Sequence, residues 1–275
     1  MINTIEDLRI KYAKWALVYF SFVVFLRFLG GKYMYNFVGQ PVVSPDFDYL
    51  FWLILATKLP QTLIASPLLS GIMDGLIILL PILCLIFIKN RALIGVTLFI
   101  FFIHTITTEM YSVSHSKTVV CIFLVLIPAV FSNKTFLLLA DFGRYFGASI
   151  LVSAAYWKYH NGALFTKYNY VSELINQYTD FGILYPSKYL YKISLFLVNH
   201  PPLADFLFKI LFITQALFIL TFITRKFDKL LIIPLVGFSI TTWIFMGIYN
   251  MDITILFVPF WFSMTINQAY SLKAQ

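Results

Sequence analysis

The sequence predicts an all-α integral membrane protein, on three observations. Of the 275 residues, 60% are hydrophobic and only 12% are charged, whereas about a quarter of a soluble domain is charged. The mean hydropathy is +0.85, which leaves too few polar side chains to cover a soluble surface of this size. Long apolar runs also recur along the chain, several near the roughly 20 residues that a membrane-spanning helix needs.

Eight apolar runs are the best candidates for spanning helices. They cover residues 12–29, 72–88, 93–107, 119–132, 142–157, 206–224, 230–248 and 253–266. The stretch 49–69 is also apolar, but it contains Pro60, Pro67 and Lys58. We therefore expect an interfacial or re-entrant segment there, with a ninth crossing as the alternative. Short interfacial helices are expected in the outer loops, one of them within 172–199, and the whole chain 1–275 is predicted to be a single domain.

The distribution of basic residues predicts the orientation. Short basic segments flank the predicted spans, and eight crossings place all of them on one side; these residues are Arg9, Lys11, Lys14, Lys89, Arg91, Lys134, Arg225, Lys226, Lys229 and Lys273. Because short basic loops stay in the cytoplasm, we expect both termini to lie in the cytoplasm. We expect the membrane to be a bacterial inner membrane. Basic loops facing anionic lipid account for the net charge of +8 without nucleic acid as a partner.

Polar side chains collect at the predicted outer ends of the spans, where ionisable groups are costly and are functional candidates. They are His104, Glu109, His115, Lys117, Lys158, His160, Asn161, Asn250 and Asp252. The alternative for each histidine is a hydrogen-bonded packing residue. His104 and Glu109 are five residues apart, a poor spacing for one helical face, so no metal site is predicted.

Other polar residues are predicted to be structural. Asp141 and Arg144 are expected to pair within one helix, and Asp74 and the pair Asp205–Lys209 are given structural roles. Cys84 and Cys121 lie in apolar runs and are expected to be small buried residues. No phosphate-binding loop, nucleophile elbow or zinc-protease motif is present in the sequence, which argues against nucleotide-driven transport by this chain alone.

The run 142–157 is predicted to be central in the bundle. Gly143 and Gly147 are four residues apart, as are Ser149 and Ser153, and small residues at this spacing let helices approach closely. Lys158 follows one turn beyond Ala154. A lysine in such a crowded place would lose part of its hydration and could serve as a base. The alternative is a lysine that extends to the lipid headgroups, which composition alone favours.

Three segments carry a resemblance to a known family. Residues 154–165 (AAYWKYHNGALF), 114–117 (SHSK) and 237–242 (GFSITT) resemble motifs of the horizontally transferred transmembrane (HTTM) domain, the membrane domain of vitamin K-dependent gamma-carboxylases. The resemblance implies that Lys158 deprotonates reduced vitamin K or a related quinone, that the base formed with oxygen removes a γ-proton from a peptide glutamate, and that CO2 then adds. It implies an electrostatic role for His115. Ser239 stands where the family has a histidine.

Two hypotheses follow. The first is a gamma-carboxylase-like enzyme with Lys158 and His115 as catalytic residues and quinone- or substrate-binding side chains at His104, Trp157, His160, Asn161 and Ser239. The second is a non-catalytic membrane protein that binds a quinone, lipid or peptide and assists maturation or export of a small secreted peptide. No extramembrane region comparable to the carboxylases follows the last run, which favours the second. A transporter with spans broken at Pro81, Pro128 and Pro234 is a third alternative, but no inverted repeat is visible.

Overall fold

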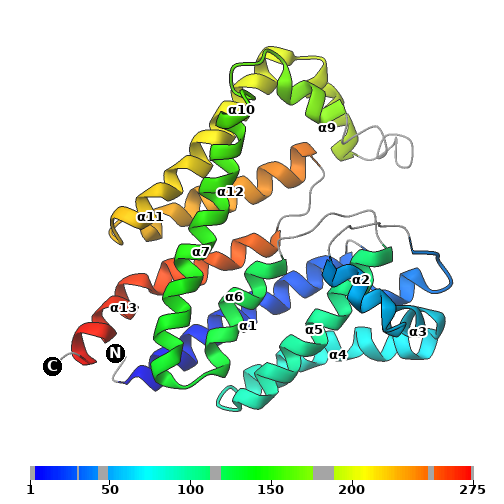
Figure 1. Cartoon of the computed structure of the whole chain (residues 1–275), viewed down its shortest axis with the longest axis vertical. Coiled ribbons are helices and arrows are strands. Elements are labelled where there is room, and N and C mark those ends of the chain that lie inside the picture. The colour runs from blue at the N-terminus through cyan, green and yellow to red at the C-terminus, as the bar shows by residue number, and fades with distance from the viewer. Residues whose placement is uncertain are drawn as a thin grey trace. The chain divides into compact units, whose positions relative to one another are not determined.

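The structure is a computed structural model that describes residues 4–29, 31–42, 49–111, 119–175, 189–246 and 251–273 (Figure 1). Over these ranges the regular structure consists of α-helices and short 3-10 helices, and no strand occurs. This confirms the predicted all-α class. The motif residue His115 and the loop residue Asn250 lie outside the described ranges.

The helices form two compact units, residues 1–140 and 141–275. The first unit contains α1 (Ile5–Leu29), η1 (Met34–Phe37), α2 (Tyr49–Ala56), α3 (Leu59–Ala65), α4 (Pro67–Ile86), α5 (Arg91–Tyr111) and α6 (Val119–Val130). Helix α7 (Asn133–His160) begins in the first unit and continues into the second. The second unit contains α9 (Tyr189–Val198), α10 (Pro201–Ala216), η2 (Leu217–Ile219), α11 (Leu220–Ile223), α12 (Asp228–Met246), η3 (Met251–Leu256) and α13 (Phe257–Lys273).

Five helical segments in the described part of the chain are long and apolar enough to cross a membrane. They are Ile5–Phe37, Pro67–Ile86, Arg91–Tyr111, Asn133–His160 and Pro201–Ile223, and they cover five of the eight predicted runs. The other three runs fall on α6, α12 and α13, which have 12, 19 and 17 residues. The count of eight crossings therefore stays a prediction. Helix α7 begins at Asn133, well before residue 142. Its first turn is polar and the charged Asp141 interrupts the apolar residues that follow, so hydropathy alone missed this part of the helix.

The stretch 49–69 is divided rather than continuous. Helices α2 and α3 have 8 and 7 residues, each far shorter than a membrane crossing requires. Lys58 separates them with a left-handed backbone (φ 59°), a conformation that non-glycine residues seldom adopt. This agrees with an interfacial or re-entrant segment better than with a ninth crossing.

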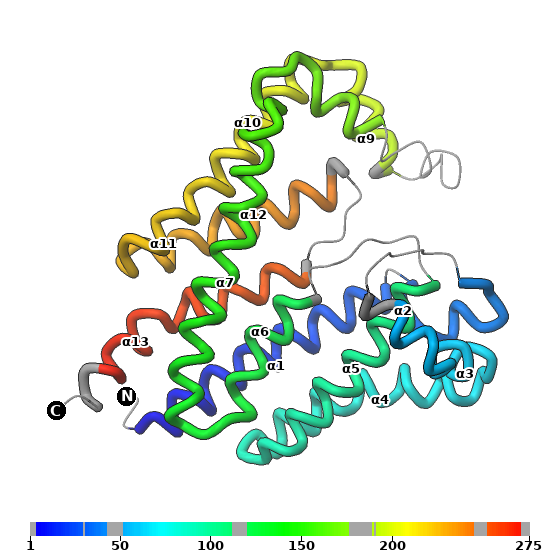
Figure 2. Tube along the Cα trace, in the orientation of Figure 1, coloured from blue at the N-terminus to red at the C-terminus, as the bar shows by residue number. Residues whose placement is uncertain are grey.

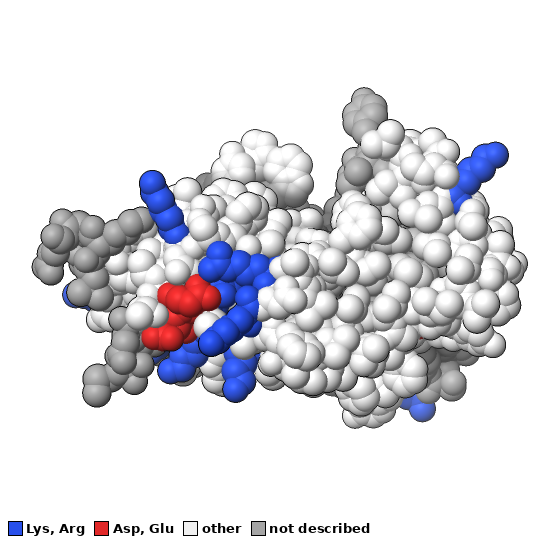
Figure 3. Space-filling view, turned by 90° about the horizontal axis from the view of Figure 1, so that it is seen from below, with Lys and Arg blue, Asp and Glu red and all other residues white. Residues whose placement is uncertain are grey.

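Much of the surface is apolar. Leu68, Phe99 and Ile233 are 72%, 62% and 71% exposed. Figure 3 shows a mostly uncharged face with one cluster of acidic and basic side chains and a few separate basic ones. Soluble monomers rarely expose apolar patches of such extent, so this surface fits contact with lipid. Pro81, Pro128 and Pro234 lie inside α4, α6 and α12, so these prolines do not end the helices as the transporter alternative requires.

Close packing at the centre of α7 is confirmed at one of the predicted positions. A Cβ atom on Gly147 would lie 2.7 Å from a methyl carbon of Leu256, so only glycine fits there without displacement. Ser149 and Ser153 are exposed and donate to carbonyls of their own helix. The prediction of a packed face was therefore wrong for the two serines. Within the same unit, α9, α10 and α12 pack against one another (Figure 2).

Candidate ligand site at Lys158

Lys158 is fixed inside the second unit rather than extended away from it. Its Nζ donates a hydrogen bond to Oε1 of Gln215 on α10 at 2.8 Å and lies 3.5 Å from the Ala154 carbonyl oxygen. Gln215 is only 2% exposed. A lysine reaching for lipid headgroups would not meet a buried amide, so this contact argues against the headgroup alternative.

The amide orients the amine without supplying a counter-charge. An ammonium has three N–H donors, and among the described residues no carboxylate hydrogen bonds to Nζ. The remaining directions can therefore serve a ligand hydroxyl or carbonyl. In its neutral form the same amine can accept a proton from such a hydroxyl.

The end of α7 is formed by a local backbone motif. The N–H of Ala163 donates to the Lys158 carbonyl and that of Gly162 to the Tyr159 carbonyl, both at 3.0 Å, and Gly162 has φ +67°. This is a Schellman motif, in which glycine supplies the left-handed residue. It turns the chain back immediately after the lysine and places the next segment beside α10.

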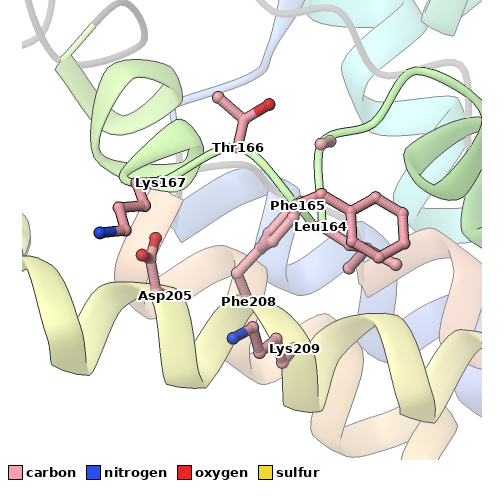
Figure 4. A pocket seen from close by; sticks show the side chains of 8 residues that line it. Leu164, Phe165, Thr166, Lys167, Asp205, Phe208 and Lys209 are labelled. Atoms are coloured by element: carbon pink, nitrogen blue, oxygen red, sulfur yellow. The ribbon is translucent and has the colours of Figure 1, made fainter.

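A small pocket lies where that segment meets α10 (Figure 4). Its volume is about 70 Å3. Its apolar wall includes Leu164, Phe165 and Phe208. Its charged side chains are Lys167, Asp205 and Lys209. Asp205 Oδ2 accepts from the Tyr168 backbone N–H at 3.2 Å, which is the structural role predicted for it. The two lysines make the pocket suited to a polar or anionic group at the end of an apolar molecule.

The other predicted binding residues do not meet the Lys158 amine in the described contacts. Trp157 is 61% exposed, and the His160 ring stacks on it with centroids 5.9 Å apart. Asn161 is exposed. These three side chains form an aromatic and polar surface at the end of α7, which is suited to a headgroup or a peptide but not to chemistry at the amine.

His104 and Ser239 have other surroundings. His104 belongs to the first unit, where its Nε2 lies 2.8 Å from Asp74 Oδ1. Ser239 is fully buried and donates to the Leu235 carbonyl of its own helix. Ser239 is thus bonded within α12, whereas His104 of α5 contacts Asp74 of the neighbouring helix α4.

Two polar pairs replace the intrahelical pair predicted for Asp141 and Arg144, and that prediction was wrong. Arg144 binds Asp228, and Asp141 binds Arg225 at 2.8 Å. Arg225 lies in the α11–α12 connection and Asp228 is the first residue of α12, and sequence spacing cannot predict that either packs against α7. Gln215 was also missed, although a single amide inside the apolar run 206–224 was a signal that could have identified it.

Comparison with known proteins adds no relative to this picture. No protein-family model, no curated protein and no solved structure matches the chain. The likeness to the HTTM domain therefore rests on the quoted motifs alone.

Proposed function

We propose that this chain is an integral membrane protein that binds a reduced lipid quinone, vitamin K or a relative, where α7 meets α10, and uses Lys158 as a base. The proposed reaction is of the gamma-carboxylase type on a peptide, at the extracytoplasmic face of a bacterial inner membrane. The observation that supports it is the Lys158 amine, held 2.8 Å from the buried Gln215 amide. The resemblance of residues 154–165 to the HTTM motif points to the same lysine.

The residues present fit a quinol. The half-buried amine can meet a hydroxyl group, and Gln215 fixes its direction. A small pocket of the same unit, whose lining does not include Lys158 or Gln215, offers apolar and cationic side chains. When bound, the reduced quinone would supply with oxygen the strong base that removes a γ-proton from glutamate before CO2 adds. Lys158 in its neutral form would take the hydroxyl proton, and Gln215 would keep the resulting ammonium in place.

A second candidate function is favoured by Ser239 and by the exposed end of α7. Ser239 occupies the position of the family's histidine but is bonded to its own helix, so one polar partner of the reaction is replaced. Trp157, His160 and Asn161 form an exposed surface. The second function is that of a non-catalytic membrane protein, which uses the same features without turnover. Such a protein binds a quinone, lipid or peptide, or a partner membrane protein, and assists maturation or export of a small secreted peptide.

Extraction and mass spectrometry of lipids that co-purify with the protein test the proposal. We expect a quinone with the wild type, a much smaller amount with Lys158→Ala and an unchanged amount with Lys226→Ala, which removes an exposed lysine of the same unit. Equal quinone in the wild type and Lys158→Ala would remove Lys158 from the site. Absence of quinone from all three proteins would refute the quinone-dependent function.

A turnover measurement separates the two functions. The purified protein is supplied with the reduced quinone, oxygen, bicarbonate and a glutamate-containing peptide. Quinol oxidation and incorporation of labelled CO2 that are lost in Lys158→Ala support the enzyme. Retained quinone without either reaction supports the binding protein. Gln215→Leu should lower both readouts in the first case, because the amine loses its only described side-chain partner.

A further inference from the structure

The pocket between α10 and the segment that follows α7 has features that a quinol does not use. Neither Lys158 nor Gln215 lines it. Its lining contains two lysines, Lys167 and Lys209, whereas a neutral quinol carries no negative charge to match them. The pocket therefore calls for an occupant of its own.

The pocket is built on a fixed framework. Tyr170 and Phe208 stack with ring centroids 5.2 Å apart and belong to a buried apolar cluster against which Leu164 packs. Asp205 Oδ2 accepts from the Tyr168 N–H at 3.2 Å, and Tyr168 has a left-handed backbone (φ 61°) that non-glycine residues seldom adopt. The walls are therefore in place before any ligand binds.

Two cations and one anion meet in this pocket. Figure 4 shows Lys167 extending towards Asp205, and Lys209 follows Asp205 one turn further along α10. Neither lysine side chain has an ion pair with a described residue, so both ammonium groups keep N–H donors for a ligand. Two lysines and one aspartate leave one net positive charge, which matches the single negative charge of a phosphate diester.

The size of the pocket fits the same group. Its volume of about 70 Å3 exceeds the share of one water molecule, about 30 Å3. This volume is sufficient for one tetrahedral phosphate but not for a sugar or a nucleotide. Phe165, which lines the pocket, is 74% exposed, so a phosphate inside can remain attached to a larger molecule outside.

The pocket lies where two helical segments that can span a membrane approach their ends. These segments are Asn133–His160 and Pro201–Ile223. The same end carries exposed aromatic side chains, which are Trp157, Tyr159, Phe165 and Tyr168. Aromatic residues of this kind are typical of the membrane–water interface, where the phosphates of phospholipids also lie.

An exposed apolar stripe on α10 begins beside the pocket. Phe206, Ile210 and Ile213 recur at the spacing of one helical face and are 60%, 42% and 55% exposed. Lys209 lies one turn before Ile213 and therefore borders this stripe. A molecule whose anionic group occupies the pocket can thus lay an acyl chain along α10.

We propose that the pocket binds the phosphate of an anionic phospholipid whose acyl chain lies along the α10 stripe. Lys167 and Lys209 bind the phosphate oxygens, and the second carboxylate oxygen of Asp205 accepts from a headgroup hydroxyl. A free phosphate would satisfy the lysines but would leave the stripe without a specific partner. The inference goes beyond the proposed function and does not depend on it, because Lys158 and Gln215 are not part of the pocket.

Native mass spectrometry of the delipidated protein in detergent tests the site, with dioleoyl phosphatidylglycerol as the probe. Dioleoyl phosphatidylcholine has the same chains without the net negative charge, and dioleoylglycerol has them without the phosphate. We expect phosphatidylglycerol to bind most tightly, and equimolar inorganic phosphate not to displace it. Equal binding of the three lipids would overturn the proposal, and so would displacement by inorganic phosphate, which would mean a site for a soluble anion.

Lysine variants locate the binding. Lys167→Gln combined with Lys209→Gln should weaken phosphatidylglycerol binding roughly ten- to thirtyfold, because each lysine near the surface contributes about fivefold. The matched control is Lys192→Gln combined with Lys226→Gln, which removes two exposed lysines of the same unit that do not line the pocket. The control should leave binding unchanged, and similar losses in both double variants would reduce the effect to general charge attraction and overturn the site.

Apolar variants test the stripe. Ile210→Ala combined with Ile213→Ala should weaken phosphatidylglycerol binding, whereas Leu230→Ala combined with Ile233→Ala should not, although the α12 positions are 59% and 71% exposed. Equal effects of the two pairs would contradict a chain site on α10. Quinone content tests Lys158 and phosphatidylglycerol binding tests Lys167 and Lys209, so failure of one proposal is distinguishable from failure of the other.

Discussion

Arg144 and Asp228 form the most deeply buried ion pair of the described residues, with side chains 1% and 0% exposed. The guanidinium binds both carboxylate oxygens, at 2.5 and 3.1 Å, and the Thr221 carbonyl at 2.7 Å. Removing one partner leaves the other charge buried without compensation. Arg144→Met should therefore lower the free energy of unfolding by about 3–5 kcal/mol, measured by denaturant titration in detergent.

The control for this prediction is an ion pair near the surface. Arg91 lies 3.0 Å from Glu6, and the two side chains are 35% and 36% exposed, so Arg91→Met should cost at most about 1 kcal/mol. The double variant Arg144→Met with Asp228→Leu should regain most of the loss. Similar costs for Arg144→Met and Arg91→Met would contradict the burial of the Arg144 pair.

At the residue scale the sequence predicted where polar groups matter but not how they pair. Asp74 and Asp205 accept hydrogen bonds from backbone N–H groups, as expected of structural residues, and both cysteines are buried as predicted. The partners of Asp141 and Arg144 could not be predicted, because spacing along one helix says nothing about the connection that packs against it. Gln215 stands out as the single amide in the run 206–224, but spacing could not predict that it meets Lys158.

At the element scale, the Schellman motif that ends α7 depends on a glycine with a left-handed backbone. Gly162 has φ +67° and nothing within 4 Å of an added Cβ atom, so Gly162→Ala tests backbone strain alone. We expect it to lower the free energy of unfolding by about 1–2 kcal/mol. Gly237 in α12 also has open space around it but no positive φ.

Gly237→Ala is therefore the matched control, and it should raise stability by up to about 1 kcal/mol through helix propensity. The two substitutions should move the unfolding midpoint in opposite directions. A shift of the same sign for both would mean that Gly162 does not require its left-handed backbone. Because Lys158 lies at the start of this motif, Gly162→Ala should also reduce retention of a quinone.

The contact between Gly147 and Leu256 gives a second prediction for α7. Gly147→Val would force its side chain into the buried Leu256, and overpacking of this kind costs about 1–3 kcal/mol. Ser149→Val, at an exposed position of the same helix, should change thermal stability little. Combining Gly147→Val with Leu256→Ala should relieve part of the loss, and an additive loss in the double variant would contradict the contact.

At the scale of the whole molecule, hydropathy identified the all-α class and the five longest apolar helices. It could not settle the number of crossings, because α6, α12 and α13 are near or below the length of a full span. Hydropathy also placed the start of α7 too late, because its first turn from Asn133 is polar and Asp141 interrupts the apolar residues that follow. Topology therefore has to be tested by labelling.

Eight crossings with cytoplasmic basic loops place Lys89 and Lys226 inside the cell and Asn161 and Thr166 outside. All four side chains are exposed, and the native Cys84 and Cys121 are buried and can be replaced by alanine. In that background, a membrane-impermeant maleimide should label Asn161→Cys and Thr166→Cys in intact cells. Lys89→Cys and Lys226→Cys should react only after lysis. Labelling of Lys89→Cys and Asn161→Cys from the same side would refute this topology and move the Lys158 site away from secreted peptides.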